Sequence, residues 1–275
     1  MNKVVIVMCE GPHDVAFLRS VLRANNFKAN DRCKIGEFPY PINNLLKQEV
    51  EKSNVEELNL QEIKQALLPT ATLKKQNSCM LFYALGGDTR KDKRKKLIAN
   101  IKDLTPQKGQ IGEDKTPAFS IVYFFDADQQ GVDSRLKDLN NELEEIFKGL
   151  SFDTINKNGE IIAINGISIG AYIFSDSSTN KGKLEDILLP LMRKDNESIF
   201  DNAEAYIKNN PIKEDRKKQN FDTSKSTIGI AGQLQKSGAS NFDIIRQSDY
   251  LSKEKILEDD ACKHIVAFFE KLVNG

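Results

Sequence analysis

The stretch VVIVMCEG occupies residues 4–11 and continues directly into PHDVAFLRSVL at residues 12–22. Its apolar, β-branched run lacks polar alternation, which is typical of a central parallel strand covered on both faces. A proline in the first turn and the apolar spacing that follows predict a helix beginning at Pro12. The chain therefore opens with a predicted strand and helix, with Glu10 at the strand end and Asp14 one helical turn later.

A second apolar stretch, FSIVYFFDAD at residues 119–128, ends on Asp126 and Asp128. In a parallel sheet the carboxyl ends of both strands lie at one edge, where open α/β sheets bind their ligands. Carboxylates that close could not all stay ionised without a cation among them, and hard oxygen ligands suit Mg²⁺ or Mn²⁺. We therefore expect a metal site formed by Glu10, Asp14, Asp126 and Asp128.

Alternating strand and helix patterns predict an α/β fold with a mainly parallel sheet flanked by helices. Further strands are expected at residues 79–85, 159–165 and 170–176, and helices around residues 90–101 and 132–150. Residues 30–75 are interpreted as an insertion, with a loop at 38–44 and one helix at 55–69. The α/β domain is expected to span residues 1–178, with a helical C-terminal extension packed on it at 179–275 and a single final helix near 253–273.

Three short motifs follow the predicted strands, and together they resemble the Toprim domain, most closely its stand-alone and OLD-type nucleases. The motifs are Glu10-Gly11, Gly86-Gly87 and Asp126-Ala127-Asp128, and the resemblance covers about residues 3–175. It implies hydrolysis of phosphodiester bonds in DNA or RNA, with Mg²⁺ or Mn²⁺ as the cofactor. Topoisomerases of this class carry a third acid where this chain has Gln130, which argues against topoisomerase chemistry.

The same resemblance implies further site residues in the C-terminal part. Glu185 and Asp186 are expected as additional metal ligands that complete a two-metal site, although acids at a predicted helix start also fit a capping role. Lys225 is expected to act in catalysis beside the four carboxylates by offsetting charge on the phosphate.

Basic residues cluster in two places, although 40 Lys and Arg residues balance 40 Asp and Glu residues overall. Each cluster allows two interpretations, a solvated helix face or a contact with a nucleic-acid backbone. The first cluster comprises Arg90, Lys91, Lys93, Arg94, Lys95 and Lys96, and we expect the first four of these residues to bind nucleic acid. The second comprises Lys213, Arg216, Lys217, Lys218 and Lys225.

Several other classes of protein are disfavoured by the sequence. The GISIG match to GxSxG at residues 166–170 has strand-like residues on both sides, whereas a nucleophile elbow needs a strand, a turn and a helix. His13 is expected to be an exposed first-turn residue, with a ligand or base role as the alternative. No Walker A motif is present, the four cysteines lack zinc-site spacing, and the first apolar run is too short for a membrane span. We therefore expect a cytoplasmic protein without a membrane partner.

Three functional hypotheses remain. The first is a metal-dependent Toprim nuclease. The second is a non-catalytic or partner-dependent Toprim-fold module that binds nucleic acid or regulates a separate protein. The third is a phosphatase or nucleotide-processing enzyme, which salt dependence would separate from nucleic-acid binding.

Overall fold

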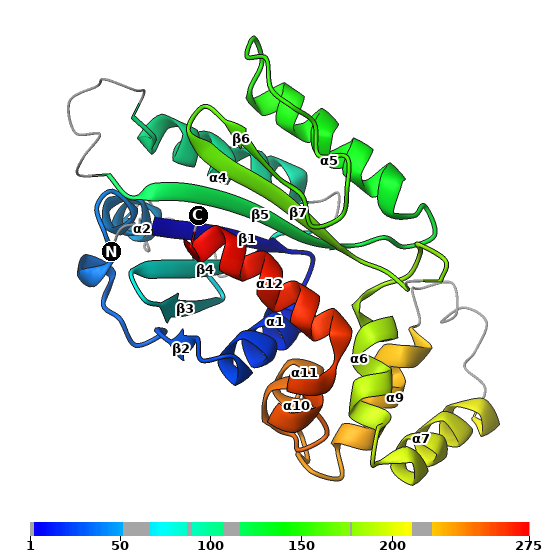
Figure 1. Cartoon of the computed structure of the whole chain (residues 1–275). Helices are drawn as coiled ribbons and strands as arrows, with labels where there is room; N and C mark the ends of the chain where they lie inside the picture. The colour runs from blue at the N-terminus through cyan, green and yellow to red at the C-terminus, as the bar shows by residue number, and fades with distance from the viewer. Residues whose placement is uncertain are drawn as a thin grey trace.

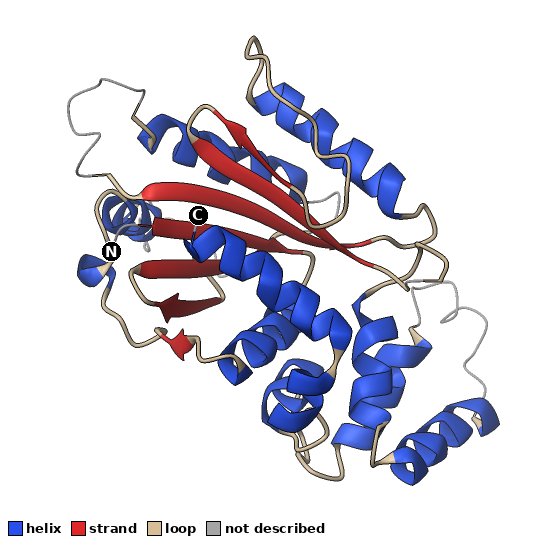
Figure 2. Cartoon of the chain, in the orientation of Figure 1, coloured by secondary structure: helices blue, strands red, loops and turns tan. Residues whose placement is uncertain are grey.

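A seven-stranded sheet forms the centre of the computed structural model, which describes residues 3–51, 67–86, 90–106, 116–176, 178–210 and 222–274 (Figures 1 and 2). In spatial order the strands are β2 (Lys28–Ala29), β3 (Ala71–Lys75), β4 (Ser78–Ala84), β1 (Lys3–Cys9), β5 (Ala118–Asp126), β7 (Ile167–Phe174) and β6 (Ile161–Ile164). The four central strands β4, β1, β5 and β7 pair in parallel, while β2, β3 and β6 add antiparallel edges. The predicted α/β class with a mainly parallel central sheet is confirmed.

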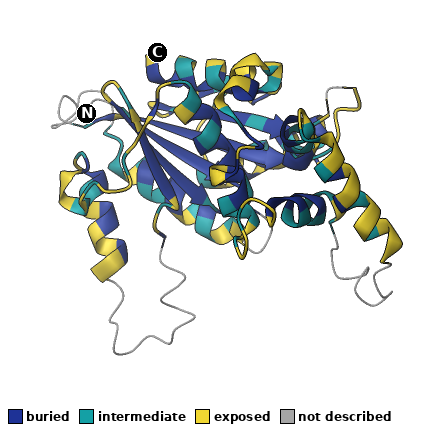
Figure 3. Ribbon diagram, turned by 90° about the horizontal axis from the view of Figure 1, so that it is seen from below, coloured by how far each residue is buried: buried dark blue, intermediate teal, exposed yellow. Residues whose placement is uncertain are grey.

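The central strands are apolar throughout because helices cover both faces of the sheet. All six residues from Val4 to Cys9 are fully buried, as are Ile121 to Phe124 in β5. Figure 3 shows these strands in dark blue between helices whose outer sides are exposed. A strand buried on both faces has no solvent side, so its sequence shows a continuous apolar run rather than alternation.

The helices form two layers. One face of the sheet carries α2 (Ile42–Glu51), α4 (Lys91–Leu104) and α5 (Val132–Ile146). The other face carries α1 and the C-terminal helices, which are α1 (Pro12–Ala24), α6 (Leu184–Arg193), α7 (Glu197–Asn209), α9 (Thr223–Gly232), α10 (Asn241–Gln247), α11 (Lys253–Glu258) and α12 (Asp260–Asn274). None of the described helices combines the length and the apolarity that a membrane crossing requires.

The C-terminal helices share a hydrophobic core with the sheet. Phe269 of α12 stacks on Phe124 of β5 with ring centroids 5.3 Å apart and an angle of 10° between the planes. Phe268 and Phe174 also contact Phe124, and Figure 1 shows α12 lying along the sheet beside α1. Burying aromatic rings in this way links the last helix of the chain directly to its central strand.

The interpretation of residues 30–75 as an insertion missed two elements that belong to the sheet layer and its cover. Strand β3 extends the sheet by pairing antiparallel with β4, and Ala71 and Leu73 are buried there. Helix α2 begins at Ile42, inside the segment 38–44 that was predicted to be a loop. The helix predicted at 55–69 lies mostly outside the described residues. Local composition missed β3 because two of its five residues are lysines, which leaves an apolar run too short to be recognised.

Two turns decide the outcome of two further sequence predictions, the single final helix and the strand that contains Ser168. The predicted final helix is divided into α11 and α12 at Asp259, whose side chain accepts a hydrogen bond from the Cys262 N–H at 2.8 Å and caps the second helix. Strands β6 and β7 form a hairpin through Asn165 and Gly166, which both have positive φ, the arrangement that an Asn-Gly turn favours. Ser168 therefore lies inside a strand, as expected, and not at a nucleophile elbow.

Candidate functional site

Three acidic side chains meet where β1 and β5 end. Pairing in register brings Cys9 beside Phe124, so the next residue, Glu10, reaches the end of β5. There Glu10 Oε2 accepts a hydrogen bond from the Asp126 N–H at 3.2 Å. Asp14 lies in the first turn of α1 and accepts a 2.6 Å hydrogen bond from the Gly11 N–H through Oδ2. The adjacency that the strand ends predicted for Glu10, Asp14 and Asp126 is therefore present.

A fourth carboxylate comes from the start of α6. Asp126 Oδ1 accepts a hydrogen bond from the Leu184 N–H at 2.8 Å, which fixes the N-terminus of α6 against the end of β5. The next residue, Glu185, is only 2% exposed. Its Oε1 lies 3.6 Å from His13 Nδ1 and 3.6 Å from Lys225 Nζ. Glu185 and Lys225, both expected from the resemblance alone, thus join the cluster.

We call Glu10, Asp14, Asp126 and Glu185 the acidic cluster. Each of these side chains has one carboxylate oxygen with a partner. For Glu10, Asp14 and Asp126 the partner is a backbone N–H, and for Glu185 it is the pair of side chains His13 and Lys225. The second oxygen of each accepts no hydrogen bond from the described residues, and Glu185 Oε2 is fully buried in that state. A buried oxygen without a donor is costly unless another group, such as a cation, binds it.

The electrostatics of the cluster disfavour full ionisation. Burial and the nearby Asp126 carboxylate raise the pKa of Asp14 well above its ordinary value, although the Gly11 hydrogen bond acts to lower it. Burial and the Glu10 carboxylate raise the pKa of Asp126 to about 8, against the lowering effect of the Leu184 hydrogen bond. Removal of charge from water and repulsion between like charges both favour the protonated form. The cluster therefore holds protons at neutral pH unless positive charge is supplied.

Glu185 differs from its neighbours because two basic side chains face it. Burial acts to raise its pKa, but the His13 hydrogen bond and the Lys225 charge together lower it. For Lys225 burial acts to lower the pKa, and the charges of Glu185 and Asp222 raise it instead. Glu185 thus carries a negative charge more readily than Asp14 or Asp126 does.

The donor set fits a hard divalent cation in chemistry, since it consists of carboxylate oxygens that lack partners. Within the described residues, however, no group of three His, Cys, Asp or Glu side chains is arranged so that it could hold a metal ion. Each carboxylate is turned toward the N–H or cation that holds its first oxygen. Metal binding would therefore require side-chain rotations at the cluster.

Two predicted ligands lie elsewhere. The Asp128 side chain is 52% exposed and binds Arg135 Nη2 at 2.7 Å, although its charge still contributes to the raised pKa of Asp126. Asp186 Oδ2 accepts a hydrogen bond from the Lys183 N–H at 2.9 Å, which is the helix-capping alternative for this residue. Arg135 was not predicted, and its position one turn into the helix after the DxD motif is the signal that could have identified it.

The first basic cluster is largely occupied by contacts within the protein. Arg94 is 5% exposed, pairs with Glu142 at 2.8 Å and donates to the Leu85 carbonyl, so it belongs to the interior and does not present a surface to nucleic acid. Lys91 and Lys95 both pair with Glu145. Arg90 donates to a backbone carbonyl at the end of β4, and Lys96 lies 3.9 Å from Glu49. The predicted phosphate contacts of Arg90, Lys91 and Lys93 remain predictions.

In the second basic cluster only Lys225 lies within the described residues, where it faces Glu185. The other members of that cluster, between residues 213 and 218, lie outside them. His13 was expected on the surface, but its side chain is only 27% exposed and lies beside Glu185. The signal for His13 was its position between two predicted acidic ligands.

Comparisons with known proteins identify a family. A crystal structure of a hypothetical protein from Pyrococcus horikoshii OT3 is similar over 98% of this chain and 99% of its own, with a TM-score of 0.56 and 14% identity, which shows a shared fold. No curated protein matched the chain. A family model described as a protein of unknown function, DUF3226, matches residues 4–274. Because that match spans nearly the whole chain, the protein belongs to the DUF3226 family.

Proposed function

We propose that this protein is a Toprim-type enzyme that hydrolyses phosphodiester bonds in DNA or RNA with the help of Mg²⁺ or Mn²⁺. The observation that carries the proposal is the acidic cluster, in which four carboxylates from three parts of the chain each keep one oxygen without a partner. Such a set of oxygens, one of them fully buried, is suited to binding divalent cations near a phosphate.

Glu10, Asp14, Asp126 and Glu185 would hold the ions, with Asp128 at the rim after release from Arg135. Bound metal would supply a Lewis acid and a water of lowered pKa. The backbone N–H groups of Gly11, Asp126 and Leu184 hold the carboxylates of Asp14, Glu10 and Asp126 close together before the ions bind.

Lys225 has a distinct role in this proposal. Its Nζ lies 3.6 Å from Glu185 and 3.8 Å from Asp222, and the side chain is 44% exposed. The ammonium group is therefore held beside the acidic cluster while still open to a ligand. A cation in that position would offset negative charge that develops on a phosphate during cleavage. His13, on the other side of Glu185, would hold this carboxylate in place.

The test is cleavage of end-labelled single- and double-stranded DNA and RNA with Mg²⁺, with Mn²⁺ and with EDTA. Intact protein is compared with Asp126→Ala and with Asp249→Ala, a control that removes an exposed acid in the C-terminal part. We expect metal-dependent cleavage that disappears in Asp126→Ala and persists in Asp249→Ala. Cleavage that is equal in all three proteins would refute the assignment of the site.

A partner-dependent module without activity of its own is the second candidate. The observation that favours it is the occupation of the first basic cluster, where Lys91, Arg94 and Lys95 are paired with acids of α5. With a net charge of zero, strand binding then needs another surface or another protein. A folded protein that binds Mn²⁺ through Asp126 but cleaves no nucleic acid would favour this candidate.

A further inference from the structure

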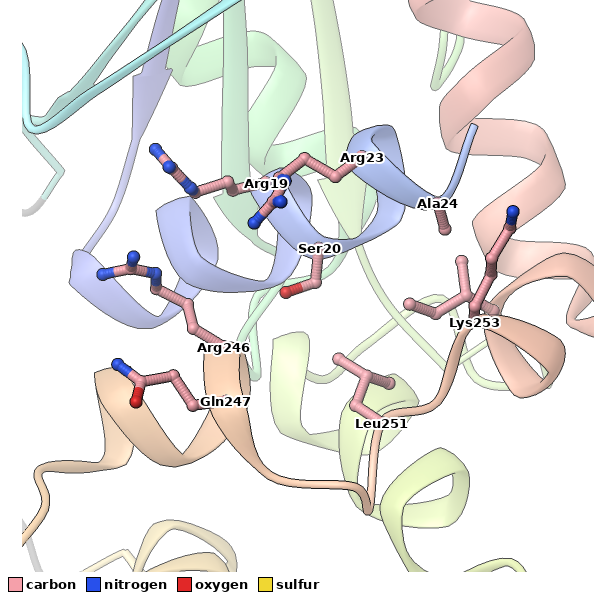
Figure 4. Close-up of a pocket in the computed structure, with 9 residues that line it drawn as sticks. Arg19, Ser20, Arg23, Ala24, Arg246, Gln247, Leu251 and Lys253 are labelled. Carbon is pink, nitrogen blue, oxygen red and sulfur yellow. The ribbon is translucent and has the colours of Figure 1, made fainter. Parts of the chain in front are cut away.

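A pocket lies between α1 and the helices α10 and α11, away from the acidic cluster. The pocket has a volume of ≈ 430 Å³. Four basic side chains line it, together with aliphatic carbons of Ala24, Leu251 and Ile256. The basic residues are Arg19, Arg23, Arg246 and Lys253 (Figure 4). In Figure 4 the three arginines gather at one end of the pocket and Lys253 lies at the other, with Ala24 and Leu251 between them.

Arg19 is the fixed element of the arginine end. It is only 7% exposed and forms an ion pair with Asp31. The Asp31 carboxylate also accepts a hydrogen bond from the Thr72 backbone N–H. Its Nε is buried without a hydrogen-bond partner. A buried guanidinium N–H without an acceptor is uncommon, because the group loses water and gains nothing in return. The arginine end therefore has unused donor capacity.

The other cations add positive charge that the protein neutralises only in part. Arg246 lies 4.9 Å from the Phe242 ring centroid and 3.9 Å from Asp243. Burial acts to raise the pKa of Asp31, but the Arg19 hydrogen bond and the Thr72 N–H lower it, with a further contribution from the charge of Arg246. Asp31 thus stays ionised between two arginines. Arg23 has no ion-pair partner among the described residues, so the arginine end keeps an excess of positive charge.

The pocket is separate from the acidic cluster. Arg19 and Arg23 are one helical turn apart and share a face of α1, whereas Asp14 is five residues before Arg19 and lies about 140° around the helix axis. The Asp14 side is buried against the strand ends, and the Arg19 side meets α10 and α11. A ligand in the pocket would contact none of the acidic cluster.

We propose that this pocket binds a phosphate-bearing ligand, with the phosphate held by Arg19, Arg23 and Arg246 and the organic part resting on the aliphatic floor. Planar guanidinium groups match phosphate oxygens in pairs, and several of them converge here. The apolar carbons between the arginines and Lys253 suit a nucleoside or sugar rather than a bare inorganic anion. The phosphate could belong to a free nucleotide or to a nucleic-acid strand. This inference does not rest on the proposed nuclease activity.

The experiment uses the full chain in EDTA, so that metal at the acidic cluster makes no contribution. Binding of ATP, pyrophosphate and a fluorescein-labelled 20-nucleotide single-stranded DNA is measured by calorimetry and anisotropy. The variant Arg23→Gln/Arg246→Gln removes two pocket charges. The control Lys148→Gln/Lys208→Gln removes the same charge from exposed positions elsewhere. Arg19 is left unchanged because it is buried and ion-paired. Thermal unfolding confirms that both variants remain folded.

We expect the pocket variant to bind at least one probe about tenfold or more weakly, since it loses charge-assisted hydrogen bonds, and the control to bind as the intact protein does. A loss confined to ATP and pyrophosphate identifies a nucleotide site, and a loss confined to the oligonucleotide identifies a strand-binding site. The proposal is overturned if the pocket variant binds every probe as tightly as the intact protein does, or if the control loses as much affinity as the pocket variant. It is also overturned if the intact protein binds none of the probes.

Discussion

Replacing Asp126 with asparagine removes an ionisable group from the most crowded part of the acidic cluster without changing its shape. The asparagine oxygen can still accept the Leu184 N–H that Asp126 Oδ1 accepts at 2.8 Å. In the folded protein the pKa of Asp126 is raised from 3.8 to about 8, first by burial and then by the Glu10 charge. Below pH 3.8 the carboxyl group is protonated in both folded and unfolded chains and has no effect on the pH dependence.

Between these two pKa values the folded protein binds more protons than the unfolded chain. The free energy of unfolding therefore falls as pH rises through this window, and the loss levels off above about pH 8. At about 1.4 kcal/mol for each pH unit, the interval from 3.8 to 8 sets an upper limit of roughly 6 kcal/mol. Asp14, whose pKa is also raised and which lies close to Asp126, can take up a proton in its place, so we expect Asp126→Asn to be about 2–4 kcal/mol more stable than the intact protein at pH 8.

The assay is urea unfolding followed by circular dichroism at pH 5 and pH 8 in EDTA. The gain in stability from Asp126→Asn should be largest at pH 8 and shrink toward pH 5. Asp249→Asn, a substitution at an exposed position, should show no such trend. Addition of Mg²⁺ at pH 8 should then stabilise the intact protein more than the variant. An Asp126→Asn protein that is less stable than the intact protein at pH 8 in EDTA would refute this reasoning.

Three further substitutions test the surroundings of the site. In Gly86→Ala the new Cβ would lie 2.0 Å from the Glu10 Cα, so the end of β1 must shift, and we expect a melting temperature several degrees lower together with weaker Mn²⁺ binding in calorimetry. Arg94→Met leaves the buried Glu142 carboxylate without its partner, and we expect a loss of about 3–5 kcal/mol in urea unfolding. Phe269→Ala removes a ring stacked on the central strand, and we expect it to lower the free energy of unfolding by about 3–5 kcal/mol in the same assay.

Each of these has a control. For Arg94→Met it is the double variant Arg94→Met/Glu142→Leu, which should recover most of the lost stability because no unpaired charge remains inside. For Phe269→Ala it is Leu234→Ala, at a position 73% exposed, which should change the free energy of unfolding by less than about 0.5 kcal/mol. For Gly86→Ala it is Gly36→Ala, where a Cβ would meet nothing within 4 Å. Unchanged Mn²⁺ binding in Gly86→Ala would show that Glu10 is not part of a metal site.

The central strands were predictable because a strand covered on both faces must be apolar along its whole length. That pattern located β1, β4 and β5, and the parallel arrangement then placed Glu10 and Asp126 at one edge. The two strands β2 and β3 at one side of the sheet were harder to predict. Strand β3 carries lysines at its end, and β2 spans only two residues, so neither shows a periodic signal.

The misjudged charges had a detectable pattern. Arg94 stands in the apolar stripe that Leu97, Ile98 and Ile101 continue along α4, and Glu142 stands next to Leu143 in the stripe of α5. A charge on the buried face of each of two helices indicates an internal ion pair rather than a surface for nucleic acid. Whether a residue in a basic run can bind nucleic acid is therefore better predicted from the helix face on which it lies than from its position within the run.

The sequence by itself determined the central parallel strands and the helices that follow them, the apolar core and the edge at which three acids meet, because these follow from local hydrophobic periodicity and from the geometry of parallel strands. Only the tertiary structure decided that Glu185 completes the acidic cluster, that Asp128 binds Arg135 and that Arg19, Arg23 and Arg246 line one pocket. The contacts of Glu185 and of the three arginines join residues that are far apart in the chain, and they depend on the packing of α1 against the C-terminal helices. The contact between Asp128 and Arg135 of α5 depends on which side-chain rotamers the two residues adopt. No local pattern in the sequence encodes either the packing or the rotamers.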